Sequence, residues 1–253
     1  MKESKSLSQR LYAFLTDPKK VKWSTTAAFM VFGLTIVIGY IIAQFDPAGP
    51  GGDLAGYNII DDFISNMGSI RFTPFPYLLD AGCIITAFLL IPTAFYMEKV
   101  LAPLPETAED IKECSRMRLR LGSIGFAWMV IGLIGMFGVG LFSEDLGIIL
   151  QPYTGEDLHW IFTMVVFGGL AMGGFFYGIL VLFYKTIIPK WLGLYMIFVP
   201  SICASILFGT GFIPIFEWMT LMSTIAYLMI GGIYVLKHIN KELAAPKTDL
   251  NKS

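Results

Sequence analysis

The sequence predicts an all-α membrane protein: a polytopic transmembrane bundle of six helices with both termini in the cytoplasm. Hydrophobic residues make up 55% of its 253 positions and charged residues only 15%, whereas a soluble domain is about one-quarter charged. Six apolar stretches are each long enough to provide the roughly 20 residues that a helix needs to cross a bilayer. Lysine and arginine are also concentrated at alternate ends of these stretches.

The first 22 residues are assigned to a cytoplasmic N-terminal segment. They are charged and lack the apolar core of a cleavable signal peptide. Leu7, Leu11, Phe14 and Leu15 would share one face of a helix. We therefore expect either a short helix at the inner membrane surface or a partly ordered tail.

The predicted transmembrane domain extends over residues 23–238, and residues 239–253 form a cytoplasmic tail. Pro92 and Pro200 fall inside spans, where a proline should kink the helix. Gly169 and Gly173 follow a small-x-x-x-small spacing, which favours close helix packing within the chain or between copies. The six spans cover approximately Ser24–Phe45, Phe75–Met97, Leu119–Phe142, His159–Phe183, Trp191–Ile213 and Glu217–Leu236.

The basic residues predict the orientation of the bundle. Seventeen of the eighteen Lys and Arg residues fall on the side of the predicted bundle where the chain begins and ends. Arg71 alone falls on the other side. Because basic loops are retained in the cytoplasm, both termini should be cytoplasmic and the protein should reside in the cell membrane.

Acidic residues gather on the predicted outer side and supply the candidate site. Asp80 would lie roughly 9 Å inside the second span at 1.5 Å per residue, and ionisable groups within spans are costly and often functional. The candidates for catalysis are Asp145, His159 and Ser65, and those for metal binding are Asp62, Asp80, Asp145 and His159. The wider group adds Asp61, Glu144 and Glu217.

Two functions and one structural role suit this group. A histidine with several carboxylates can bind a divalent metal or perform acid–base chemistry. Alternatively, the same side chains form hydrogen bonds that fasten the outer loops to the bundle. For any single residue the structural role is favoured.

Both long outer segments contain helix-capping patterns. In the first, Asn58 with Asp61 would begin a short amphipathic helix that Gly68 ends. In the second, Thr154 and Asp157 form a T-x-x-D pattern. The fourth span would then begin near Gly155, with His159 in its second turn.

Several common sites are missing from the sequence. It contains no P-loop, no G-x-S-x-G and no H-E-x-x-H motif. With two histidines in the chain, a three-histidine zinc site within one chain is excluded. Cys83 and Cys203 lie in apolar stretches, and we expect free buried thiols rather than a disulfide framework.

The outer segments also resemble those of a known family. IIDDFISNMGS resembles the I-S-x-x-G stretch of an uncharacterised prokaryotic membrane family, the domain of unknown function nine-nine-eight. GVGLFSEDLG followed by LHWIF is similar to that family's G-x-F-P-x-D and histidine segment. Here Ser143 replaces the usual proline, and the insertion before His159 is longer.

This likeness covers about Trp23 to His238, and a fainter similarity extends to six-span proteins of the FRAG, DRAM and Sfk type. The resemblance implies six spans but no activity. The positions that it highlights are Ser65, Gly68, Asp145 and His159.

Three functions follow as hypotheses. The favoured one is a non-enzymatic protein whose outer face binds membrane lipid or a membrane partner, either another protein or a second copy of the chain. The second is a membrane-embedded enzyme, dependent on a divalent metal in one version, that acts on a lipid or its headgroup. The third is a small-solute transporter, which the shortage of ionisable groups deep in the spans disfavours. No nucleic-acid partner is expected.

Overall fold

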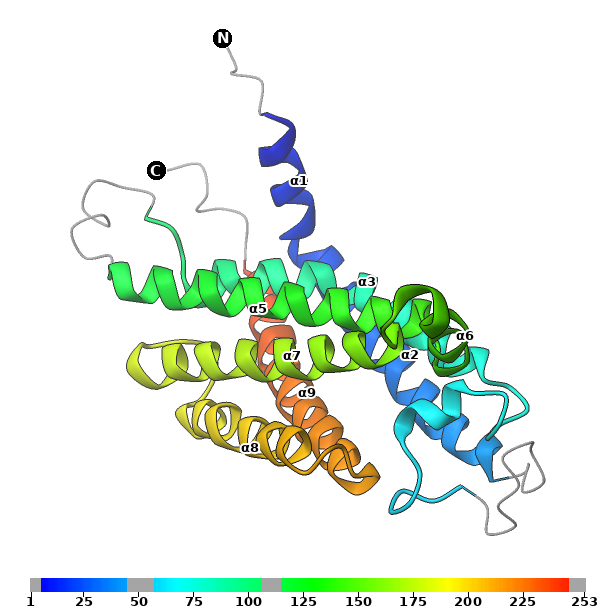
Figure 1. The fold of residues 1–253 in the computed structure, drawn as a ribbon. Helices are drawn as coiled ribbons and strands as arrows, with labels where there is room; N and C mark the ends of the chain where they lie inside the picture. Colours follow the sequence, from blue (N-terminus) through cyan, green and yellow to red (C-terminus); the bar gives the residue numbers. More distant parts are fainter. Residues whose placement is uncertain (1–5, 45–56, 106–114, 246–253) are drawn as a thin grey trace.

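The computed structural model of the chain describes residues 6–44, 57–105 and 115–245. These residues form eight α-helices and one short 3-10 helix, without a strand among them (Figure 1). Six of the helices are long and apolar enough to cross a membrane, which confirms the predicted fold class. They are α2 (Pro18–Ala43), α3 (Tyr77–Leu101), α5 (Arg116–Leu141), α7 (Leu158–Phe183), α8 (Lys190–Gly209) and α9 (Pro214–Ala244).

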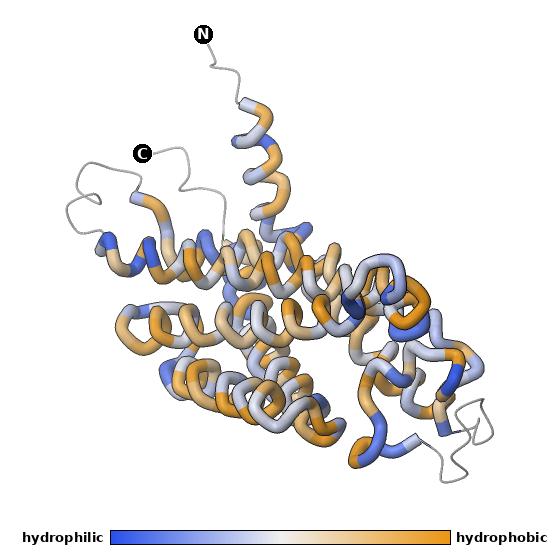
Figure 2. The backbone as a smooth tube through the Cα atoms, in the orientation of Figure 1, coloured by the Kyte–Doolittle hydropathy of each residue, from blue (hydrophilic) through white to orange (hydrophobic). Residues whose placement is uncertain are grey.

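Hydrophobic residues dominate these six helices along their lengths, as Figure 2 shows, and hydrophilic residues gather near their ends. One end of the bundle carries Asp80, Glu144, Asp145 and Glu217, and we call it the acidic end. The other carries lysines and arginines such as Lys20, Lys99, Arg118 and Lys185, and we call it the basic end.

A short helix, α1 (Leu7–Leu15), precedes the first long one and corresponds to the helical alternative of the two expected for this segment. It begins with a capping box in which Ser6 and Gln9 exchange hydrogen bonds between side chain and backbone. Leu7, Leu11 and Phe14 remain exposed on it. An exposed apolar face is what a helix at a membrane surface requires.

Helices α5 and α7 lie side by side and pack through glycines (Figure 1). A Cβ atom added at Gly169 would clash with the backbone of Gly132 on α5. A Cβ at Gly173 would lie 2.7 Å from the sulfur of Met129. The small-residue spacing predicted from the sequence therefore serves packing within one chain.

Helices α2 and α9 meet toward the basic end and separate toward the acidic end (Figure 1). Near the basic end, Val21 of α2 packs with Val235 and Ile239 of α9 in one buried cluster. Slightly further along, the ring of Phe29 fills the space beside Gly232. The divergence beyond this point leaves room between the two helices.

The segment between α2 and α3, which the sequence predicts to be the first outer segment, does not form the predicted amphipathic α-helix in its described residues. The side-chain Oδ1 of Asn58 accepts hydrogen bonds from the N–H groups of Ile60 and Asp61, both at 3.0 Å, and this closes a turn instead of starting a helix. The chain is extended at Phe63 and then forms the 3-10 helix η1 (Ile64–Gly68). Gly68 ends this element, as it was expected to end the α-helix.

The second outer segment contains a helix that the sequence did not reveal. Helix α6 (Glu144–Thr154) has Ser143 as its N-cap and Gly155, whose φ of 77° is left-handed, as its C-cap. The prediction that Thr154 caps the fourth span is therefore wrong, because Thr154 is the last residue of α6. Asp157 is the actual N-cap of α7, which places His159 in the first turn rather than the second.

Candidate functional site

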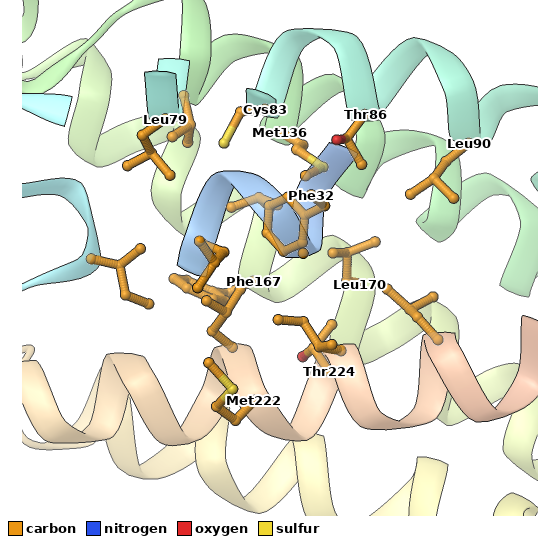
Figure 3. Close-up of a pocket in the computed structure, with 18 of the residues that line it drawn as sticks. Phe32, Leu79, Cys83, Thr86, Leu90, Met136, Phe167, Leu170, Met222 and Thr224 are labelled. Carbon is orange, nitrogen blue, oxygen red and sulfur yellow. The ribbon is translucent and has the colours of Figure 1, made fainter. Parts of the chain in front are cut away.

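A cavity of about 270 Å³ lies inside the bundle between α2, α3, α5, α7 and α9. Its walls are predominantly apolar, and Figure 3 shows side chains from several helices converging on it. Phe32, Leu79, Met136 and Phe167 are among them. At the acidic end, η1 contributes Ile64 and Ser65. Well-packed interiors contain few voids of this size.

The cavity reaches the surface of the bundle between α2 and α9. Gly33 and Val37 of α2 and Met222 and Met229 of α9 all line it, and all four are exposed. These residues belong to the apolar lengths of two helices that can cross a membrane. The opening therefore faces sideways, toward the region that lipid chains would occupy.

His159 is the histidine of this cavity, and its ring is held in one orientation. Its Nδ1 lies 2.7 Å from the carbonyl oxygen of Phe142. A carbonyl only accepts, so Nδ1 carries the proton, and Nε2 of the neutral ring is left as an acceptor. Within the described chain this buried Nε2 has no hydrogen-bond partner.

Two threonine hydroxyls on the cavity wall also lack a hydrogen-bond partner within the described residues. Thr86 of α3 and Thr224 of α9 both line the cavity, and neither Oγ1 has a partner in the described ranges (Figure 3). A lone threonine in an apolar span gives no sequence signal, because threonine usually bonds to its own helix backbone. Sequence reasoning therefore missed both residues.

Glu217 anchors the first outer segment over the cavity. Its Oε2 accepts a 2.6 Å hydrogen bond from the N–H of Ile64, and the carboxylate is 4% exposed. The neighbouring Trp218 donates from its indole N–H to the carbonyl of Asp62 at 3.1 Å. Tyr57 donates to the carbonyl of Phe63 at 2.8 Å. Three side chains thus hold the backbone that leads into η1.

Asp145 anchors the end of the same segment. Its two carboxylate oxygens accept from the hydroxyl of Ser69 at 2.8 Å and from the N–H of Ile70 at 2.9 Å. Asp80 lies against Gly68, where an added Cβ would be 2.9 Å from the Asp80 Oδ1. The two contacts of Asp145 are of the kind that the structural interpretation of these acidic residues expects.

Glu144 lies next to Asp145 in the sequence, and its surroundings disfavour the ionised form of its carboxyl group. Burial and the nearby charge of Asp145 raise its pKa above the ordinary 4.5, while Ser65 and Arg71 oppose that shift. Its Oε2 is buried and has no partner in the described part of the chain. Ser65 thus lies between the cavity, which it lines, and this carboxylate.

The structure does not gather the predicted metal ligands. In residues 6–44, 57–105 and 115–245, no three His, Cys, Asp or Glu side chains are grouped so that they could hold one ion. Asp62 accepts from the N–H of Asn58 at 2.8 Å, and Asp145 is committed to Ser69 and Ile70. Cys83 is buried and free, as expected, and Cys203 likewise.

Comparisons of the chain with protein-family models, with curated proteins and with solved structures found no match. The resemblance of the outer motifs to an uncharacterised six-span family remains an expectation. The chemistry of the cavity and of its acidic end therefore carries the functional argument.

Proposed function

We propose that this multi-pass membrane protein binds a single lipid, with one hydrocarbon chain inside the cavity and the polar end near His159. The observation that carries the proposal is an apolar cavity that opens sideways between two membrane-crossing helices. Ligand pockets usually measure about 300–1,000 Å³, and 270 Å³ lies just below that range. One chain, rather than a whole bulky lipid, fits such a space.

The surroundings of the opening support a lipid rather than a water-soluble ligand. Gly33, Val37, Met222 and Met229 offer no charge to a solute. Apolar cavities of about 150 Å³ stay dry and take up hydrophobic guests. Within a bilayer the most abundant hydrophobic guest is a lipid chain, and a lateral opening admits it without a passage through water.

The polar groups are placed where an amphiphile needs them. Ser65, His159 and Glu217 all belong to the acidic end of the cavity, whereas Leu90 and Leu228 line its deeper part. A lipid lying along this axis would put its chain among the aliphatic side chains. Its polar end would then meet the groups that still have hydrogen-bonding capacity.

Two glycines allow a sharp test of occupancy. Gly33 lines the cavity at its opening, and Gly168 lies on α7 away from it; an added Cβ at either position meets nothing within 4 Å. Both positions therefore have room for the first carbon of a side chain. We would purify the wild type, Gly33→Phe and Gly168→Phe in mild detergent and quantify bound lipid by mass spectrometry after detergent exchange.

The expected result is stoichiometric lipid on the wild type and on Gly168→Phe, with a clear loss on Gly33→Phe. Equal melting temperatures of the two variants would show that the loss is not caused by unfolding. Equal lipid on all three proteins, or none on the wild type, would overturn the proposal.

A further inference from the structure

No Lys or Arg is among the described residues that line the cavity, and this restricts the lipid that it can hold. His159 is 8% exposed, and its Nδ1–H is already used by the carbonyl of Phe142. Its Nε2 has no partner among the described residues. Keeping the ring neutral avoids an unpaired buried charge, and the neutral Nε2 can only accept.

The ring cannot easily turn to find another partner. Helix α6 packs across the start of α7 at Gly147, where an added Cβ would lie 2.9 Å from the Cβ of His159. The Phe142 hydrogen bond fixes the ring from the other side. The unpartnered acceptor therefore belongs to a side chain that lines the cavity and that a hydrogen bond and the packing of α6 hold in place.

The charged groups around it are also acceptors. Glu217 lines the cavity and uses one carboxylate oxygen to bind the Ile64 N–H. Glu144 is buried beside Ser65 and has an unpartnered oxygen in the part of the chain that the structure describes. Arg71, which is exposed, is the cation that acts on Glu144. A phosphate or carboxylate headgroup would lie beside these carboxyl groups, and no Lys or Arg lines the cavity in the described part of the chain to balance its charge.

We propose that the lipid in this cavity carries an uncharged polar end with a free hydroxyl, and that this hydroxyl donates to Nε2 of His159. A monoacylglycerol has the required chemistry: one chain, a hydroxylated end and no phosphate. The inference rests on the proposed function, because it specifies the ligand of the same cavity. It excludes anionic lysolipids as preferred ligands.

Two lipids that differ only at the polar end test this inference. Oleoylglycerol and oleoyl-lysophosphatidate share one chain, so a preference between them reports on the headgroup. Binding of each would be titrated by native mass spectrometry on delipidated, full-length protein. We expect oleoylglycerol to bind the wild type about tenfold or more tightly than the lysophosphatidate, the scale of one hydrogen bond plus charge repulsion.

Two substitutions of His159 separate its two nitrogens. The amide of His159→Asn reaches the position of Nδ1 and can still donate to Phe142, but it removes the Nε2 acceptor. His159→Gln places an amide oxygen near the position of Nε2. We expect oleoylglycerol affinity to fall about three- to tenfold in His159→Asn and to recover in His159→Gln, with lysophosphatidate binding little changed in either.

Each failure has a separate meaning. If both lipids bind equally, or the lysophosphatidate binds more tightly, the headgroup inference is wrong while lipid binding stands. If His159→Asn keeps the full preference, Nε2 is not the acceptor. If neither lipid binds the wild type, or if Gly33→Phe binds both as well as the wild type does, the proposed function itself fails.

Discussion

The N–H of Ile64 donates to Oε2 of Glu217 over 2.6 Å, although the two residues lie 153 positions apart in the chain. This hydrogen bond ties the start of η1 to the first turn of α9 and so joins the segment between α2 and α3 to the last of the six long helices. Both groups are buried. The bond also fixes Ile64 and Ser65 at the cavity, since η1 supplies both residues.

Removing the acceptor at Glu217 should loosen η1. In Glu217→Leu the Ile64 N–H loses its partner, which costs about 1–3 kcal/mol when a buried donor is left unpaired. In Glu217→Gln the amide oxygen can still accept. We expect a lower melting temperature and faster hydrogen exchange at the Ile64 amide in Glu217→Leu but not in Glu217→Gln. Equal exchange in the two variants would show that the bond does not hold the segment.

Asp145 should protect the neighbouring turn from proteolysis. Its carboxylate holds Ser69 and Ile70, which directly precede the exposed Arg71. In Asp145→Ala that turn loses both contacts, so trypsin should cleave after Arg71 several-fold faster. Asp61→Ala is the matched control, because Asp61 is exposed and contacts Asn58 within its own turn. Unchanged cleavage in Asp145→Ala would contradict this role.

Glu144 should make the protein less stable as the pH rises. Burial and Asp145 raise its folded-state pKa above the ordinary 4.5, so the folded protein holds this proton more tightly than the unfolded chain does. Its contribution is therefore fully present below pH 4.5 and is lost as the pH rises through the folded-state pKa. Glu144→Gln should raise the melting temperature by a few degrees at neutral pH.

The direction of this effect is tested by measuring, across pH, the difference in melting temperature between Glu144→Gln and the wild type. The gap should shrink as the pH falls toward 4.5, because the wild-type side chain is then also neutral. Glu156→Gln, at an exposed position on the same segment, should show no such gap. A Glu144→Gln protein that is less stable at neutral pH would mean that the ionised carboxylate is stabilising.

The six spans could be predicted because each depends on one continuous run of residues. The same holds for α1, whose apolar positions recur at helical spacing. Helix α6 escaped detection because its eleven residues include Gly147 and Pro152, which weaken the helical pattern. Thr154 ends α6 and Asp157 caps α7, and the T-x-x-D pattern that they form looks the same as a capping pattern at the start of α7.

The site could be predicted only in part. The sequence indicated Asp80, Asp145 and His159 as candidates, but it could not indicate that the partners of Asp145 lie 75 and 76 positions away. The cavity exists because α2 and α9 diverge, and no local pattern in either helix encodes the separation between them. The unpartnered hydroxyls of Thr86 and Thr224 line this cavity.

The contact between α5 and α7 should depend on the glycine at position 169 but not on the neighbouring Gly168. At Gly169 an added Cβ would clash with the backbone of Gly132, whereas at Gly168 it would meet nothing within 4 Å. Gly169→Ala forces the helices apart, and overpacking of this kind costs about 1–3 kcal/mol. We expect Gly169→Ala to lower the melting temperature. Gly168→Ala should leave it unchanged or raise it slightly. Similar values for the two would contradict this packing.

Phe29 should set the depth of the cavity. With Leu90 and Leu228 it lines both the main cavity and a second one of about 40 Å³ that lies deeper in the bundle. Phe29→Ala removes the ring between them, so the joined space should accept longer hydrocarbon chains. The lipids that co-purify with this variant should therefore shift toward longer chains than those of the wild type.

Phe32→Ala is the control, because Phe32 lines the main cavity but not the deeper one. It enlarges the cavity without opening its inner end, so it should raise the amount of bound lipid or leave it unchanged and keep the chain-length distribution. Phe29 also fills the space beside Gly232, so Phe29→Ala will melt at a lower temperature and must be compared well below it. An identical shift in both variants would mean that cavity volume, and not the barrier at Phe29, determines chain length.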